Sequence, residues 1–180
     1  MRPINAHTFT LMSHPSAPSS EVRAVEAGVV RAPDGMLTLT YAVSGDASRM
    51  RLPPPRLSRR ADGLWRHTCL EAFVALNPPA YLELNFSPST EWASYAFSDY
   101  RAGMAVAEDI ETPAIAVRRG ECGFTVEATV GLTCLRGATA AKIALAAVVE
   151  SSSGSLSYWA LEHPPGAPDF HHPRGFTLNI

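Results

Sequence analysis

The residues best suited to chemistry lie between positions 64 and 104 of this 180-residue chain. This segment holds two of the three tryptophans, a histidine, two carboxylates in strand-like surroundings and a tyrosine–arginine pair. Carboxylate and amide groups form hydrogen bonds with hydroxyl groups, and aromatic rings cover the apolar faces of sugars. The segment therefore favours a binding site for a saccharide, on one sheet face or at the end of a β-sandwich.

Strand alternation decides which of these side chains can act together. Residues 64–74 are predicted to form a strand, in which successive side chains point to opposite faces. One face carries the polar and aromatic residues Trp65, His67, Cys69, Glu71 and Phe73. Residues 81–86 are predicted to follow as an antiparallel strand, with one apolar face and a second face formed by Tyr81, Glu83 and Asn85. The pair would give a sheet with one apolar face and one mixed face.

Charge predicts the register of these two strands. When their apolar faces match, Glu71 lies opposite either Glu83 or Asn85. Two facing carboxylates repel each other, whereas an asparagine amide can donate to a carboxylate. We therefore predict that Glu71 lies opposite Asn85. The alternative to a ligand site is that these two side chains only satisfy each other on a half-covered sheet.

Further candidate contacts come from the segments that follow. Tyr95 lies in a third predicted strand, residues 92–98. Arg101 has an alternative role as the ion-pair partner of Asp99 or Glu91. The predicted ligand contacts are Trp65, Arg66, His67, Glu71, Asn85, Tyr95, Tyr100, Arg101, Trp159 and His163.

Short alternating segments recur along the whole chain. Residues 36–45 are the clearest, and a Pro-Asp-Gly turn joins them to a bulged strand predicted at residues 21–32. Residues 48–63 are predicted to be a surface loop whose arginines are solvated or line the rim of a cleft. A last strand is predicted at residues 174–180. About ten short strands indicate an all-β fold, so we predict one domain over residues 1–180, an antiparallel immunoglobulin-like or jelly-roll β-sandwich.

Composition excludes several classes of protein. The formal net charge is −2, and no basic stripe is present to bind nucleic acid. No apolar run approaches the roughly 20 residues of a membrane helix, and residues 1–20 lack the apolar core of a secretory signal. The three cysteines have no CxxC spacing and are predicted to be reduced, mostly buried thiols. These features predict a cytoplasmic protein without a nucleic-acid or membrane partner.

Three segments together resemble bacterial DOMON-like domains, which are relatives of the family 9 carbohydrate-binding modules. They are LWRHTCLEAFV at residues 64–74, NFSPS at residues 85–89 and PDFHH at residues 168–172. The resemblance covers residues 37–178 and implies a β-sandwich that binds a sugar or a haem and performs no chemistry. Trp65 and Glu71 match the tryptophan and the acid that recur in the sugar-binding relatives, which, unlike this chain, usually have a secretory signal.

The haem-binding branch of these domains uses a methionine and a histidine as axial ligands. Met36, Met50 and Met104 are available here, together with six histidines, but no position fixes either ligand. We therefore predict no cofactor, with haem as the alternative.

Two further alternatives follow from the same residues. Glu71 and Glu83 can be read as a glycosidase pair, and a second group can be read as metal ligands, namely Glu162, His163, Asp169, His171 and His172. Neither set has the spacing of a known catalytic motif, so we predict that the protein is not an enzyme. The other alternative is a structural module or homodimer that uses Trp65, Phe73 and Tyr81 on an exposed sheet face.

Overall fold

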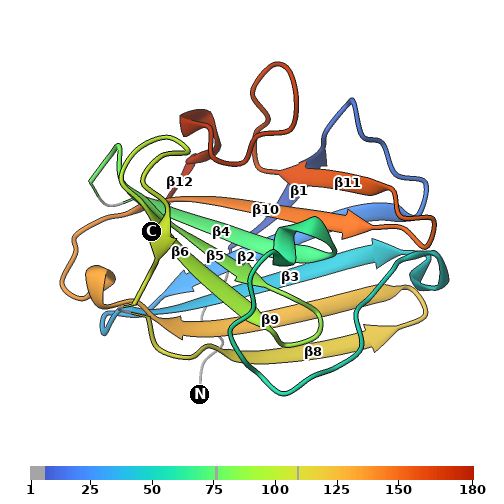
Figure 1. The fold of residues 1–180 in the computed structure, drawn as a ribbon, viewed down its shortest axis with the longest axis horizontal. Coiled ribbons are helices and arrows are strands. Elements are labelled where there is room, and N and C mark those ends of the chain that lie inside the picture. Colours follow the sequence, from blue (N-terminus) through green and yellow to red (C-terminus); the bar gives the residue numbers. More distant parts are fainter. Residues whose placement is uncertain (1–6, 76, 109) are drawn as a thin grey trace.

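The computed structural model describes residues 7–75, 77–108 and 110–180 (Figure 1). The strands are β1 (His7–Ser13), β2 (Val22–Arg31), β3 (Met36–Gly45), β4 (Cys69–Ala75), β5 (Tyr81–Phe86), β6 (Trp92–Phe97), β7 (Ala105–Val106), β8 (Ala114–Gly120), β9 (Gly123–Gly131), β10 (Lys142–Glu150), β11 (Leu156–Ala160) and β12 (Leu178–Asn179). Four 3-10 turns connect them, η1 (Ala47–Arg49), η2 (Leu64–Arg66), η3 (Thr133–Leu135) and η4 (Pro173–Gly175). In the described ranges, no helix has the length and apolar character to cross a membrane.

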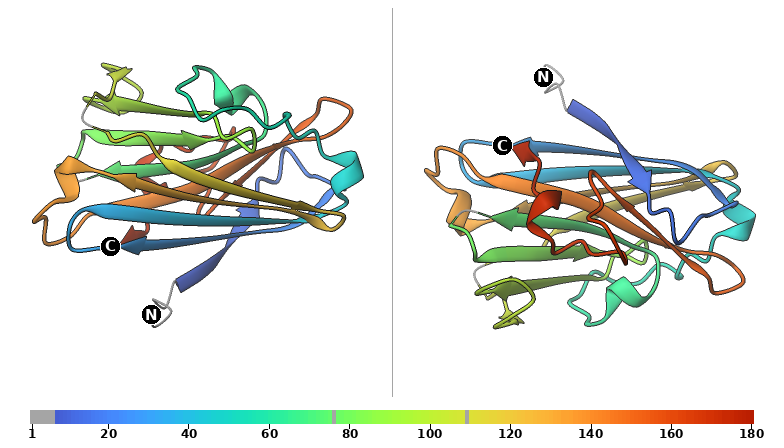
Figure 2. Two further views of the ribbon diagram at one scale, coloured as in Figure 1. Left: turned by 90° about the horizontal axis from the view of Figure 1, so that it is seen from below. Right: turned by 90° about the horizontal axis from the view of Figure 1, so that it is seen from above.

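The strands form two layers that pack face to face (Figure 2). Sheet A runs in the order β1, β2, β3, β9, β8, and sheet B runs in the order β7, β6, β5, β4, β10, β11, with β12 beside β10. β1 pairs with β2 and, at its end, with β11, so one hydrogen-bonded path passes through both layers. Every pairing between these strands is antiparallel. The all-β, antiparallel prediction is confirmed, and the sheet path has more strands than expected.

Alternation along β3 explains the core between the layers. Its inward side chains are all buried, namely Leu37, Leu39, Tyr41 and Val43. The Tyr41 hydroxyl donates to the carbonyl oxygen of Glu71 at 2.7 Å, which ties sheet A to the middle of sheet B. The strand predicted at residues 21–32 is confirmed as β2, but its bulge lies between Val22 and Ala24.

Turns shorten two of the predicted strands. The segment 64–74 begins with η2, and β4 starts only at Cys69. Gly63 precedes η2 with φ at 75°, a left-handed conformation that glycine adopts without a clash from a Cβ atom. The strand predicted at residues 174–180 is reduced to the two residues of β12. Pro173 starts the turn η4 there, and its ring fixes φ and removes a backbone donor.

The predicted cysteine environments are only partly correct. Cys69 is buried, whereas Cys122 and Cys134 are exposed, so the expectation of mostly buried thiols is wrong for two of the three. Residues 1–6, which begin the segment predicted to lack a secretory signal, lie outside the described residues. Leu76, in the connection between β4 and β5, also lies outside them.

Candidate ligand-binding site

The mixed face predicted from the sequence is the outer face of sheet B. Its central residues, which we name the floor, are Glu71, Phe73, Tyr81, Glu83, Asn85, Tyr95 and Phe97. All of them are buried, with Phe73 at 0% exposure and Tyr81 at 6%. The alternative in which Phe73 and Tyr81 form an exposed surface for a partner is therefore wrong.

The register of the floor is the one predicted from charge. Glu71 lies opposite Asn85 across β4 and β5. The amide of Asn85, however, donates to Glu83 Oε1 at 2.7 Å and not to Glu71. Residues two apart in a strand share a face, so Asn85 serves the acid beside it on its own strand. Glu83 lies between Phe73 of β4 and Tyr95 of β6.

Glu71 is a buried acid with an unsatisfied oxygen. The residue is 3% exposed, and its Oε1 has no hydrogen-bond partner. Burial raises the pKa of the Glu71 carboxyl well above its usual value, and the charge of Glu83 raises it further. Burial also raises the pKa of Glu83, against the opposing effects of Asn85 and Arg101. A buried polar atom without a partner is costly, and a ligand group bonded to Glu71 would remove that cost.

Two loops cover the floor with apolar side chains. We name these side chains the roof, and they are Leu64, Trp65, Phe170 and Phe176. The rings of Trp65 and Tyr95 meet edge to face, with centroids 5.6 Å apart. The predicted strand would carry Trp65 to this face by alternation, whereas in the structure the turn η2 carries it there.

The predicted contacts Tyr100 and Arg101 hold the C-terminal loop at the edge of the floor. Arg101 Nη2 lies 2.8 Å from Asp169 Oδ1, and the Tyr100 hydroxyl donates to the same carboxylate. Arg101 thus pairs with Asp169 and not with Asp99 or Glu91. Burial raises the pKa of Asp169, but the hydrogen bonds from Tyr100 and Arg101 outweigh it and keep this pKa below its usual value.

His171 connects this loop to the acids of the floor. Its Nδ1 lies 2.8 Å from the Tyr81 hydroxyl, which also accepts the backbone N–H of Arg101. Its Nε2 lies 3.8 Å from Glu83 Oε2, too far for a hydrogen bond. Burial, together with the charge of Arg101, lowers the pKa of His171 to about 4. The imidazole is therefore neutral near neutral pH and brings no positive charge to the floor.

The loop of residues 48–63 supplies Arg60 and Asp62 beside Tyr95. The guanidinium carbon of Arg60 lies 5.4 Å from the centre of the Tyr95 ring. Asp62 accepts the Tyr95 hydroxyl at 2.6 Å and pairs with Arg60 at 2.7 Å. Arg60 Nε is buried and has no hydrogen-bond partner. The sequence indicated only that arginines of this loop could line a cleft, and alternation gave no signal for Arg60 in particular.

Two predicted contacts are not part of the floor. Trp159 is 6% exposed and packs in the core between the layers, where its Nε1 donates to Ser157. His163 Nε2 lies 2.8 Å from the carbonyl oxygen of Met12, and its ring packs against that of His14. Trp159 therefore lies on the opposite side of sheet B from the floor, whereas the ring of His163 lies 6.3 Å from that of Phe170 in the roof. The contact of these two residues with a ligand stays a prediction.

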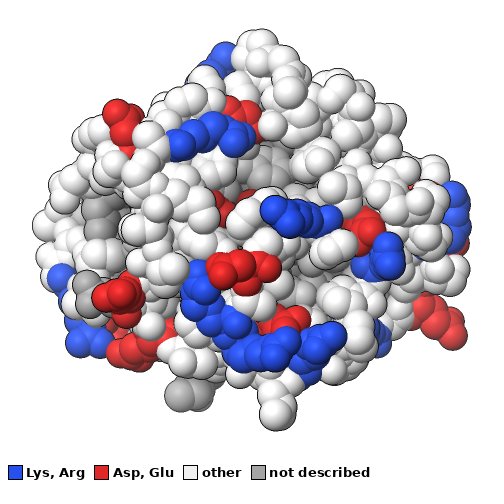
Figure 3. Space-filling model, viewed as in Figure 1, with Lys and Arg blue, Asp and Glu red and all other residues white. Residues whose placement is uncertain are grey.

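The remaining predicted contacts, Arg66 and His67, are exposed beside the floor. His67 Nδ1 lies 2.8 Å from Glu150 Oε2. Figure 3 shows this side of the molecule, where acidic and basic side chains are mixed and no large area has a single sign. Several arginines form ion pairs with nearby acids, among them Arg59 with Glu91, Arg60 with Asp62 and Arg101 with Asp169.

The residues read as metal ligands have other partners. Glu162 pairs with Arg174 at 2.8 Å, and His172 Nδ1 accepts the backbone N–H of Arg174. Asp169 and His171 bond within the edge of the floor. Over residues 7–75, 77–108 and 110–180, no group of three or more His, Cys, Asp or Glu side chains could hold a metal ion. The structure therefore gives no support to the metal-site alternative.

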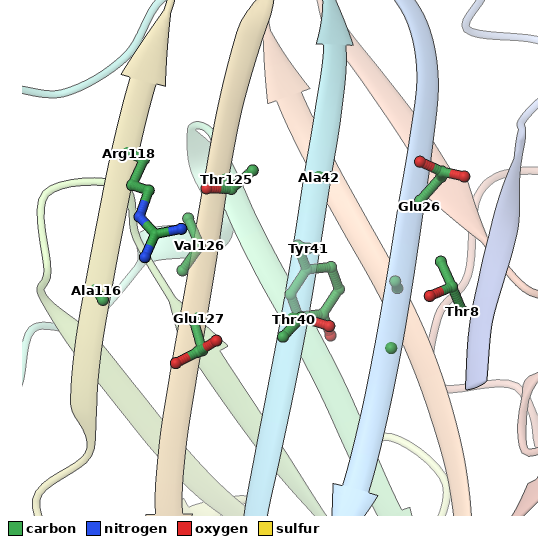
Figure 4. Close-up of a pocket in the computed structure, with 12 residues that line it drawn as sticks. Thr8, Glu26, Thr40, Tyr41, Ala42, Ala116, Arg118, Thr125, Val126 and Glu127 are labelled. Carbon is green, nitrogen blue, oxygen red and sulfur yellow. The ribbon is translucent and has the colours of Figure 1, made fainter. Parts of the chain in front are cut away.

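A separate hollow of about 340 Å³ lies on the outer face of sheet A (Figure 4). Small side chains in the middle of the sheet create it, among them Gly28, Ala42 and Ala116. Glu26, Arg118 and Glu127 border it and are exposed, so water can satisfy their charges. On the floor, by contrast, a carboxyl oxygen is buried without a partner.

Comparisons with known proteins give a fold and no family. No protein-family model and no curated protein matches the sequence. The solved structure of a candidate carbohydrate-binding protein from Bacteroides uniformis aligns with a TM-score of 0.66 at 14% identity, over 95% of this chain and 84% of that one. A family 9 carbohydrate-binding module from Caldicellulosiruptor kristjanssonii, solved with cellotriose, aligns with a TM-score of 0.56 at 12% identity, over 90% of this chain and 75% of that one. The chain therefore shares the all-β fold of these two proteins, while the DOMON-like resemblance stays a prediction.

Proposed function

We propose that the protein is a non-catalytic saccharide-binding domain whose ligand contacts the floor beneath the roof. The observation that carries this proposal is Glu71 Oε1, a buried acceptor without a partner. Arg60 Nε, beside Tyr95, is a buried donor without a partner. A hydroxyl group both donates and accepts hydrogen bonds. A ligand with several hydroxyl groups can therefore satisfy both atoms.

Aromatic side chains supply the apolar contacts that a sugar ring needs. Trp65 and Phe170 of the roof are only partly buried, so each keeps surface for a ligand. Aromatic rings bind the apolar faces of sugars at low entropic cost because they are rigid. The two solved structures compared above are described as carbohydrate-binding, which supports the saccharide class. Because the roof packs on the floor, we expect Trp65 to move when the ligand enters.

The absence of a known catalytic motif supports binding without catalysis. Glycosidases combine one protonated acid with a second carboxylate that stays ionised. Burial raises the pKa of both Glu71 and Glu83, and the two acids do not have the spacing of a known catalytic motif.

We further propose that residues 1–180 form one DOMON-like domain of the jelly-roll type that needs no cofactor and works in the cytoplasm. The resemblance of residues 64–74 and 168–172 supports the domain assignment. The composition of the sequence supports the location.

A glycan array followed by calorimetry tests the proposed function. The wild type should bind at least one glycan, and Glu71→Ala and Trp65→Ala should each weaken that binding by about tenfold or more, the loss of one good contact. Glu127→Gln, an exposed acid on sheet A, is the matched control and should bind like the wild type. Absence of binding to every glycan, or equal binding by all three variants, would overturn the proposal.

A further inference from the structure

The floor holds two acids close together with little to satisfy them. Glu71 lies opposite Asn85 and therefore diagonal to Glu83 on the adjacent strand. Diagonal neighbours in a sheet lie roughly 7–8 Å apart, within reach of long side chains. The described residues give this pair one hydrogen bond, from Asn85 to Glu83, and none to Glu71 Oε1. The pair is therefore short of hydrogen-bond donors.

The cations beside the floor are already paired. Arg101 lies 2.8 Å from Asp169, and Arg60 lies 2.7 Å from Asp62. His171 is neutral near neutral pH because burial and the charge of Arg101 lower its pKa to about 4. In the part of the chain that the structure describes, neither acid of the floor thus forms an ion pair with a charged side chain, although the charge of Arg101 lowers the pKa of Glu83 from a distance.

We propose that the saccharide carries a protonated amine and that its ammonium group binds between Glu71 and Glu83. This inference rests on the proposed function and narrows the ligand to amino sugars and their polymers. A neutral hydroxyl donates only one hydrogen bond, whereas an ammonium group has three donors to divide between two carboxyl groups. The ammonium group would also give the two acids the positively charged partner that the neighbouring side chains do not provide.

Aromatic rings stand around the same position. Glu83 lies between Phe73 and Tyr95 on the neighbouring strands, and Trp65 contacts the Tyr95 ring. The face of an aromatic ring attracts a cation, and the attraction is stronger where water is excluded. An ammonium group on the floor would therefore gain from the rings as well as from the acids.

Binding of the ammonium group is coupled to the release of a proton. Burial keeps protons on the acids of the empty floor at a pH where exposed carboxyl groups have lost them. The ammonium charge favours the ionised form, so a carboxyl proton leaves to solvent while the amine keeps its own. Arg101 with Asp169 and Arg60 with Asp62 remain balanced pairs throughout. One proton is released for each carboxyl group that ionises.

Calorimetry with matched sugars tests this inference. Glucosamine is compared with glucose and N-acetylglucosamine, and galactosamine with galactose and N-acetylgalactosamine, with chitosan and chitin oligomers as the polymeric pair. A pH of about 5.5 keeps the amines protonated, because the neighbouring oxygens lower the pKa of a sugar amine to roughly that of an α-amino group, about 7.7–8. We expect an amino sugar to bind about tenfold or more tightly than its neutral counterparts, because its hydrogen bonds to carboxylate are charge-assisted. Titrations in two buffers of different ionisation enthalpy should show proton release.

Two variants locate the effect. Glu71→Gln keeps the shape of the acid and should reduce the affinity for the amino sugar to that of the neutral sugar. Glu127→Gln on sheet A should keep the full preference, and thermal unfolding should show that both variants fold. Neutral sugars that bind as tightly as amino sugars would overturn this inference and leave the proposed function standing. Binding of no sugar in either class would overturn both, and a preference that survives Glu71→Gln would refute the assignment to the floor.

Discussion

Replacing Glu71 with glutamine should stabilise the folded protein by an amount that grows as the pH rises. Glutamine keeps the size and shape of the acid but has no proton to lose. Below the ordinary glutamate pKa of 4.5, the folded and unfolded wild-type chains both hold this proton, and the two proteins should be equally stable. Above it, the unfolded chain releases the proton, whereas burial and Glu83 keep it on the folded protein. The stability of the wild type therefore falls with rising pH until Glu71 itself ionises.

Proton linkage fixes the size of the effect. One proton retained by the folded state changes the free energy of unfolding by about 1.4 kcal/mol for each pH unit. In a chain of this length each kcal/mol shifts Tm by roughly 2–4 °C, so the variant should gain about 3–6 °C per pH unit over the window. Glu71 and Glu83 share the buried site and titrate as a pair. Glu83→Gln should act in the same direction over a narrower pH window, and so with a smaller total gain, because Asn85 and Arg101 partly oppose the rise in the pKa of Glu83.

Urea unfolding from about pH 4 to pH 8, followed by tryptophan fluorescence, measures this difference. Trp92 and Trp159 are both buried and report on the core. The control is Glu127→Gln, whose exposed carboxyl should give the same stability as the wild type at every pH. Carboxylates with lowered pKa values, such as Asp169, affect all three proteins alike and cancel in the comparison. A difference between Glu71→Gln and wild type that stays flat with pH, or that favours the wild type at high pH, would refute the reasoning.

Three further substitutions test other contacts. Tyr41→Phe should lower the free energy of unfolding by about 1–3 kcal/mol in urea, because the buried Glu71 carbonyl loses its donor at 2.7 Å; an unchanged midpoint would contradict this. Asp169→Asn should lower the free energy of unfolding by less than about 1 kcal/mol, since its partner Arg101 is half exposed. Calorimetry should nevertheless show weaker saccharide binding, because the edge of the floor loosens. An affinity equal to that of the wild type would count against a role for this edge. Arg31→Ala should speed amide hydrogen exchange in β12, because the guanidinium donates to the carbonyl oxygens of Leu135, Ala138 and Ile180. Amide protection equal to that of the wild type would refute this.

The floor could be predicted from the sequence because it lies on strands. Successive side chains of a strand point to opposite faces, so Glu71 and Phe73 must lie on the face opposite to the apolar residue between them. Repulsion between Glu71 and Glu83 then sufficed to select the register, which the structure confirms. The partner of the Asn85 amide could not be predicted in this way, because the rotamer of a side chain decides between a neighbour across the sheet and one along the strand.

The contacts around the floor could not be predicted, because they join segments that are far apart in the chain. Arg101 and Asp169 are separated by 68 positions and lie in two loops without periodicity. Nothing in either loop distinguishes this pair from the nearer alternative with Asp99. The position of Trp159 in the core could not be predicted for another reason. Its orientation depends on the pairing of β11 with β10, where Trp159 lies opposite Ala147 of the core, and the predicted strand alone did not specify this partner.

The division between floor and roof also explains how a buried acid can be kept ready for a ligand. β4 pairs along its length with β5 on one side and β10 on the other, and the Tyr41 hydroxyl fixes the Glu71 carbonyl from below. In a loop, an unsatisfied acid would turn towards water, but the backbone of Glu71 has no such freedom. The cost of the unpartnered oxygen is therefore retained in the empty protein and is recovered when a donor arrives. Ordering costs on binding fall on Trp65 and the other roof side chains, whereas Glu71→Gln should alter the choice of ligand.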